Sequence, residues 1–97
     1  MIRLRPAAAK ELAADVRYYD RAYPGRGQRF LLAVEKTLDR IDAAPLRPPI
    51  LIAPDIRSAK VERFPYRVVY LVIDDVIDVV AVAHAKRRPM YWRRRTR

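Results

Sequence analysis

The stretch YRVVYLVIDDVIDVVAVAH, residues 66–84, decides the fold of this chain. Two apolar runs rich in valine and isoleucine flank Asp74–Asp75, a pair that is typical of a tight hairpin turn. The pattern predicts two antiparallel strands, over 66–73 and 76–84. Because both runs are nearly continuous in apolar residues, we expect these strands in the middle of a sheet that helices cover on one face.

The sequence before this hairpin predicts a strand and two helices. Residues 2–5 alternate between apolar and basic side chains, as in a short strand with one solvated face. Apolar residues then recur at helical spacing over 6–23 and again over roughly 28–44. Pro24–Gly25 separates the two helices, and because the connection is short we expect an antiparallel helical hairpin.

Two segments lie between the helices and the central hairpin. Four prolines make residues 45–57 a loop or an extended edge segment. Residues 58–64 alternate in polarity and predict one more strand. The expected fold is α+β in a single domain, 1–97: an N-terminal strand, a two-helix hairpin, then three antiparallel strands that form one sheet packed on the helices.

The chain carries 21 basic and 11 acidic residues, and most of the excess charge lies at its C-terminal end. Seven of the basic residues lie within 86–97, so the remainder of the chain holds 14 basic against 11 acidic residues. Tyr91 and Trp92 stand among these cations. Cations neutralise phosphates and flat rings stack on bases, so this segment points to nucleic acid or to an acidic protein partner.

Composition excludes several other classes of site. The chain has no cysteine and one histidine, which leaves no ligand set for zinc, and its two glycines form no phosphate-binding loop. Asp74, Asp75 and Asp78 cluster near the predicted turn, where aspartate serves turn geometry, so paired catalytic carboxylates find no support. The absence of cysteine, of a long apolar run and of a secretory signal favours the cytoplasm.

Three residues of the predicted sheet are candidates for a site. Arg67 lies within an apolar strand, so its guanidinium must reach solvent or clamp a phosphate. Lys60 lies near Arg67 if their strands pair through a short turn; otherwise it is a solvated lysine that discourages edge pairing. His84 ends the last strand among cations, which favour neutral imidazole and suit a general base, although a strand-end histidine also commonly bonds a carbonyl.

The segment after His84 holds the remaining candidates. Large aromatic side chains are costly to leave in water, so we expect Tyr91 and Trp92 to anchor the start of the tail to the domain. A basic tail is often solvated, and we expect residues 93–97 to be flexible. The candidate nucleic-acid-binding residues are Lys60, Lys86, Arg88 and Trp92.

Three stretches of the chain form a recognisable set: YYDRAYPGRGQRFLLAVEKTLDRI (18–41), VERFPYRVVYLV (61–72) and AVAHAKRRPMYWRRR (81–95). They resemble the RelE/ParE superfamily of bacterial type II toxins, formerly grouped as plasmid stabilisation proteins. The first is similar to the family's helical hairpin, the second to its Arg-Phe-Pro-Tyr strand entry, and the third to its closing histidine, paired arginines, proline and tryptophan. In this order they span nearly the whole chain.

The resemblance implies a toxin that arrests the growth of its own host unless a cognate antitoxin neutralises it. That partner is an acidic protein, largely extended or helical, whose charge would suit this basic surface. RelE-like members cleave messenger RNA on the ribosome, whereas ParE-like members inhibit DNA gyrase. The resemblance implies no cofactor and leaves both targets open.

For the RNA-cleaving branch, the resemblance implies four catalytic residues. Arg67 corresponds to an arginine of the catalytic surface, and Arg87 to the arginine after the last strand. His84 and Tyr91 lie near the positions where different members place a catalytic histidine or tyrosine. The chemistry would be attack by the ribose 2′-OH on the adjacent phosphate, with cations stabilising the transition state and no metal.

The sequence departs from the RNA-cleaving pattern in three places. Ser58 stands where a second lysine is expected, and the proline-rich loop before Lys60 has no glutamate to act as a base. Tyr91 also lies one or two positions away from where the simplest alignment would put it. The helical hairpin looks more like that of sequences labelled ParE. Two alternatives therefore remain beside an active toxin: a non-enzymatic basic module that binds nucleic acid, or an inactive toxin that retains antitoxin binding alone.

Overall fold

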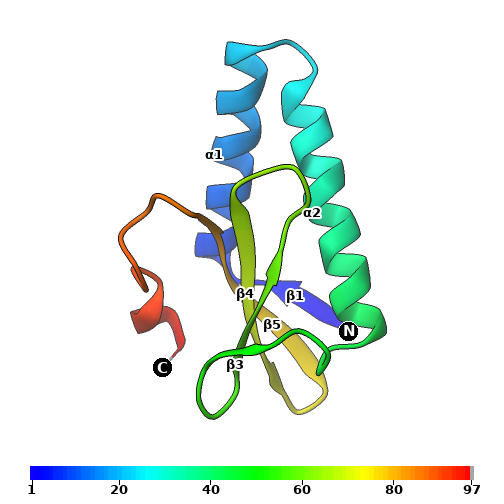
Figure 1. The fold of residues 1–97 in the computed structure, drawn as a ribbon, viewed down its shortest axis with the longest axis vertical. Coiled ribbons are helices and arrows are strands. Elements are labelled where there is room, and N and C mark those ends of the chain that lie inside the picture. Colours follow the sequence, from blue (N-terminus) through cyan, green and yellow to red (C-terminus); the bar gives the residue numbers. More distant parts are fainter. Residues whose placement is uncertain (97) are drawn as a thin grey trace.

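A five-stranded sheet packs against two helices in the computed structural model, which describes residues 1–96 (Figure 1). The strand order is β1-β5-β4-β3-β2, with β1 parallel to β5 and every other pair antiparallel. The predicted α+β fold is confirmed, and so is the central position of the hairpin strands. In chain order the elements are β1 (Ile2–Leu4), α1 (Pro6–Ala22), α2 (Arg26–Ala43), β2 (Ile50–Ile52), β3 (Ile56–Lys60), β4 (Tyr66–Ile73), β5 (Val76–His84) and a short 3-10 helix, η1 (Arg93–Thr96).

The prediction of three strands after the helices is wrong by one, because β2 forms within the proline-rich segment. It pairs with β3 at the edge of the sheet, where a strand needs ladder hydrogen bonds on one side and neighbouring prolines are tolerated. β3 ends at Lys60 rather than at residue 64, because the chain turns there. Arg63 has a φ of 69°, and the N–H of Val61 donates to the carbonyl of Tyr66 over 3.0 Å.

Asp74 and Asp75 form the predicted turn of the central hairpin. Their φ angles are 49° and 66°, as in the two-residue turns that match the twist of paired strands. Asp78 does not belong to this turn, so that interpretation is wrong. It lies within β5, 1% exposed, and accepts a hydrogen bond of 2.9 Å from Arg5 Nε. Ion pairing with Arg5 compensates the burial of its charge.

α1 and α2 form the predicted antiparallel hairpin, and a glycine sets how closely they approach. Gly27 is buried in the first turn of α2, and its N–H donates to Asp20 Oδ1 over 2.7 Å. A methyl group at this position would clash with the backbone carbonyl of Val16 in α1 and lie 2.6 Å from Asp20 Cγ, so a larger residue requires the helices to shift. Gly25, with a φ of 87°, lets α2 begin two residues earlier than predicted.

The sheet buries a core on each face. On the helix side, Phe30, Val34 and Ile41 of α2 pack against alternate residues of β4 and β5. On the opposite face a smaller cluster forms around Trp92, which the segment after β5 carries back over the sheet. The other buried members of this cluster are Ile56, Val69, Leu71, Val80 and Ala81. The C-terminal segment is therefore a second covering layer of the sheet.

Candidate functional site

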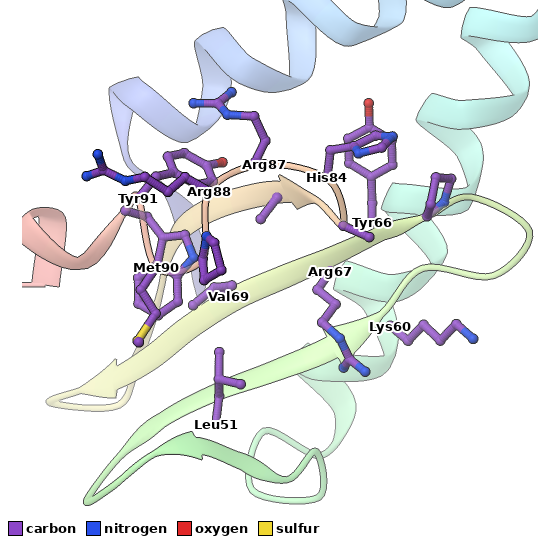
Figure 2. Close-up of a pocket in the computed structure, with 15 residues that line it drawn as sticks. Leu51, Lys60, Tyr66, Arg67, Val69, His84, Arg87, Arg88, Met90 and Tyr91 are labelled. Carbon is purple, nitrogen blue, oxygen red and sulfur yellow. The ribbon is translucent and has the colours of Figure 1, made fainter.

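A groove of about 580 Å³ lies where β3, β4 and β5 meet the segment after β5 (Figure 2). Lys86 is exposed but does not line it. No carboxylate stands among the described residues that form its walls, so the charged side chains there are cations. The candidate residues that line the groove are Lys60, Arg67, His84, Arg87, Arg88, Tyr91 and Trp92.

The sheet supplies two of these cations from directly opposite positions. Lys60 at the end of β3 pairs in register with Arg67 of β4. Directly opposite residues point to the same face of a sheet, and both side chains are exposed. Arg67 Nη1 also donates to Ser58 Oγ over 3.3 Å. The predicted proximity of Lys60 and Arg67 is confirmed, and Ser58 acts as a hydrogen-bond acceptor for Arg67.

His84 ends β5, and a backbone hydrogen bond fixes its protonation pattern. The N–H of Lys86 donates to His84 Nδ1 over 2.9 Å, so Nδ1 carries a lone pair and the proton of the neutral imidazole lies on Nε2. The ring also contacts Tyr66 edge to face, with centroids 4.9 Å apart. Nε2 is therefore a hydrogen-bond donor, whereas a general base needs an acceptor there.

Tyr91 is held by α1 and by two arginines. Its hydroxyl donates to Glu11 Oε2 over 2.5 Å. Burial raises the pKa of Tyr91, and the hydrogen bond to Glu11 together with the negative charge of that residue raises it further. The guanidinium carbons of Arg87 and Arg95 lie 4.0 and 5.3 Å from the centroid of the ring. The phenol is therefore neutral, and its proton is already engaged.

Glu11 is a residue that sequence reasoning missed, because a lone glutamate in an amphipathic helix ordinarily belongs to the solvated face. Its carboxylate accepts two hydrogen bonds from Arg95, of 2.9 and 3.2 Å, and one of 3.4 Å from the N–H of Val82. Arg95 also donates to the carbonyl of Val80 over 3.1 Å. β1 pairs with β5 only as far as Val79. Beyond Val79, the side chains of Glu11 and Arg95 therefore take the place of a neighbouring strand and satisfy the N–H of Val82 and the carbonyl of Val80.

Asp15 lies one helical turn after Glu11 and was missed for the same reason. Burial raises the pKa of Asp15, a hydrogen bond from Tyr66 lowers it, and the charge of Glu11 raises it again. The nearby charges of His84 and Arg87 lower it in turn. Two carboxylates of α1 thus lie beside the cationic groove without forming part of its walls.

Trp92 and Tyr91 anchor the C-terminal segment to the domain, as predicted. Trp92 is 3% exposed and packs into the second core cluster, so in this structure its ring is an anchor rather than a surface on which a base could stack. Residues 93–96 form η1, and Arg95 within it pairs with Glu11. The flexibility expected of 93–97 stays a prediction, and Arg97 lies outside the described residues.

Two other features are absent from the described residues. Over 1–96, histidine, aspartate and glutamate side chains form no group of three that could hold a metal ion. Within residues 1–96, none of the helices has an apolar stretch of the length that a membrane span requires.

The fold is similar to that of RelE/ParE-like toxins. The chromosomal ParDE toxin–antitoxin system from P. aeruginosa is similar, with a TM-score of 0.76 and 16% identity over 88% of this chain and 95% of that chain. The isolated E. coli RelE toxin is also similar, with a TM-score of 0.60 and 23% identity over 99% of this chain and 95% of that chain. At these identities the likeness is one of fold.

The sequence assigns the family within this class. The family described as ParE toxin of the type II toxin-antitoxin system, parDE, matches residues 2–89. Because the match covers most of the chain, the protein belongs to this family. Among curated proteins none gives a significant match. The resemblance to the RelE/ParE superfamily is confirmed, and membership of a type II family implies a cognate antitoxin.

Proposed function

We propose that this protein arrests bacterial growth as the toxin of a type II toxin–antitoxin pair, and that it does so by binding DNA gyrase without cutting nucleic acid. A cognate acidic antitoxin neutralises it. Gyrase and ribosomes are cytoplasmic, so the protein acts in the cytoplasm. The family match supports the class, and the state of two side chains in the groove supports binding over cleavage.

The observation that carries the proposal is that neither candidate proton-transfer group offers a free base. RNA cleavage needs a base for the 2′-OH proton and an acid for the leaving oxygen. His84 accepts the Lys86 N–H at Nδ1, which leaves Nε2 protonated. Tyr91 donates to Glu11, and burial raises the pKa of its phenol. The groove keeps its cations for binding but has no free base among the described residues that line it.

Ribosome-dependent mRNA cleavage is the second candidate function, and the cations of the groove favour it. Lys60 and Arg67 lie directly opposite each other, and Arg87 lines the same groove. Cations around a phosphate stabilise the charge that develops in the transition state. In this case the catalytic set is Arg67, His84, Arg87 and Tyr91, and the RNA-binding set is Lys60, Lys86 and Arg88.

Two assays on the purified protein separate these functions. We expect the protein to block supercoiling by gyrase and to leave mRNA on programmed ribosomes uncut. Cleaved mRNA with undisturbed supercoiling would overturn the proposal in favour of the second candidate. If expression without the antitoxin leaves growth unchanged and neither assay responds, the protein is an inactive toxin or a binding module, and the proposal is wrong.

A pair of variants tests the mechanism in growing cells. Arg67→Ala removes a groove cation, so it should weaken growth arrest under either mechanism. His84→Gln removes the imidazole but keeps a polar side chain, so it should abolish a nuclease and change a binding toxin little. Lys10→Ala, at an exposed position of α1, is the matched control for loss of one positive charge.

A further inference from the structure

We infer that Glu11 is a positioning residue for the groove: acting through Tyr91, it fixes the Arg87 guanidinium at the groove's rim. The inference rests on the proposed function in one respect, that the groove binds the toxin's target. Glu11 itself does not line the groove. It acts through the side chains of Tyr91 and Arg87, both of which line the groove.

The first step is that Glu11 is itself held firmly. Its side chain is 12% exposed and accepts two hydrogen bonds from the Arg95 guanidinium. Arg5 Nη1 donates to the carbonyl of Arg95, and Arg5 pairs in turn with buried Asp78 of β5. A bidentate arginine–carboxylate pair fixes geometry as well as charge. Glu11 is therefore tied to the edge of the sheet as well as to α1.

The second step is the hydrogen bond from Tyr91 to Glu11, which measures 2.5 Å. A hydroxyl bound to a carboxylate makes a short, charge-assisted hydrogen bond, stronger than one between neutral groups. This bond fixes one end of the Tyr91 ring, and the neighbouring Trp92 is buried in the core. The plane of the Tyr91 ring is thereby set relative to the sheet.

The third step leads from this ring to Arg87. The guanidinium carbon of Arg87 lies 4.0 Å from the centroid of Tyr91, within the range of a favourable cation–π contact (Figure 2). Arg87 is otherwise an exposed residue of the segment after β5. An arginine that is already in place loses less conformational freedom when it binds an anionic group, so its support should strengthen target binding.

Charge alone predicts the opposite effect, which makes the inference testable. Glu11→Gln removes one negative charge from a protein of net charge +10. A more positive toxin should attract an acidic target more strongly. A positioning role predicts weaker binding in the same variant, because the neutral amide is a poorer partner for Tyr91 and for Arg95. The two explanations therefore differ in sign.

The experiment compares Glu11→Gln, Tyr91→Phe and the double variant with the wild type. The NMR shifts of the Arg87 side chain report its place over the Tyr91 ring. We expect Glu11→Gln and Tyr91→Phe each to reduce the ring-induced shift. The concentration needed to block gyrase should rise about tenfold in each, and little further in the double variant, since both changes break one contact. Glu35→Gln, an exposed position of α2, makes the same charge change as the control.

The outcomes separate the inference from the proposed function. If the Arg87 shifts are unchanged in both single variants, the inference is wrong whatever the target is. If the shifts change but gyrase is blocked as strongly as by the wild type, Arg87 placement has no bearing on activity, and the inference is again overturned. If the wild type does not block gyrase, the proposed target fails, while the shifts still decide the positioning and the translation assay measures its effect. Should Glu11→Gln not fold, Tyr91→Phe, which loses one oxygen atom, carries the test.

Discussion

Lys60 and Arg67 lie directly opposite each other across β3 and β4, and both side chains are exposed in a groove without acidic residues among its described walls. Like charges at directly opposite positions destabilise a sheet by roughly 0.2–1 kcal/mol. Folding does not require this pair, and a ligand with negative charge would offset its repulsion. The pair is therefore better explained by binding than by stability.

Removing Lys60 should separate stability from activity. In Lys60→Ala we expect the free energy of unfolding to stay constant or to rise by up to about 0.5 kcal/mol, because the repulsion is relieved. Arg67→Ala also removes the hydrogen bond to buried Ser58, so we expect it to lose about 1 kcal/mol. Growth arrest should weaken at least about tenfold, because a charge-assisted contact is lost. Urea unfolding and a titrated induction assay measure the two effects, with Lys10→Ala as the control. A variant that loses stability yet keeps full toxicity would contradict this explanation.

Arg5 and Asp78 form an ion pair at the edge of the sheet, and removing one of them should lower the free energy of unfolding more than removing the other. Arg5 Nη2 lies 2.8 Å from Asp78 Oδ2, and the carboxylate is 1% exposed. Arg5→Ala leaves a buried charge without its partner, so we expect a loss of about 3 kcal/mol in the free energy of unfolding. Asp78→Ala should cost less, because Arg5 is 28% exposed and can turn toward water. Equilibrium unfolding in urea measures both losses.

Arg3 provides the control for this pair. Its Nε lies 3.8 Å from Asp78 Oδ1, but its side chain is 59% exposed, so Arg3→Ala should cost less than about 0.5 kcal/mol. The argument would be wrong if Asp78→Ala proved as destabilising as Arg5→Ala.

Gly27 should be the least replaceable residue of the helical hairpin. A Cβ there would clash with the backbone carbonyl of Val16 and lie 2.6 Å from Asp20 Cγ, so Gly27→Ala forces α1 and α2 apart and should cost about 3 kcal/mol. Gly25→Ala should cost about 1 kcal/mol, because the added methyl group makes only an ordinary contact of 3.8 Å with Arg29 Nη1 but must keep a φ of 87°. Thermal unfolding compares the two. Equal losses would show that the hairpin relaxes around the added methyl group.

Arg95 and Arg94 stand side by side in η1 but should behave differently. Arg95 pairs with Glu11 and is 25% exposed, so Arg95→Ala should lower the free energy of unfolding by about 2 kcal/mol. Arg94 is exposed, and Arg94→Ala should stay within about 0.5 kcal/mol of the wild type. Amide exchange gives a second measure: the N–H of Val82, which donates to Glu11, should exchange faster in Arg95→Ala. The exchange of 93–97 in the wild type tests their predicted flexibility.

Asp15 should make stability depend on pH in an unusual direction for an aspartate. Burial raises the pKa of Asp15 above its ordinary value of 3.8, so the folded state holds the proton more tightly than the unfolded state. The stabilising effect is therefore present below 3.8 and is lost as the pH rises through the raised value. At neutral pH the ionised carboxylate is a cost, which Asp15→Asn removes while keeping an oxygen for Tyr66.

We therefore expect Asp15→Asn to be more stable than the wild type at pH 7, with a difference that shrinks as the pH falls. Urea unfolding across this range measures the difference. A gap between the two proteins that does not vary with pH would rule out this origin.

Local pattern was sufficient for most of the secondary structure. Apolar spacing identifies both helices, and Asp74–Asp75 identifies the central turn, because these features depend on neighbouring residues alone. The sequence left the segment of β2 open between a loop and an extended edge segment. Prolines weaken the local strand signal there, and the pairing with β3 that makes it a strand is not a local property. The sequence-based prediction put Asp78 in the turn for a similar reason. Its partner Arg5 lies 73 residues away, so the residues around Asp78 do not indicate the ion pair.

Apolar period, motif order and charge are properties of the chain, and they were enough to predict the α+β class, the family and the cations that line the groove. How those residues contact one another follows from the packing of distant segments. Glu11 accepts a hydrogen bond from Tyr91, which lies 80 residues away in the chain. The tautomer of His84 is set by a hydrogen bond from the backbone N–H of Lys86. Hydrogen bonds depend on distances of tenths of an ångström between separate segments, and only the packed sheet, helices and C-terminal layer set those distances.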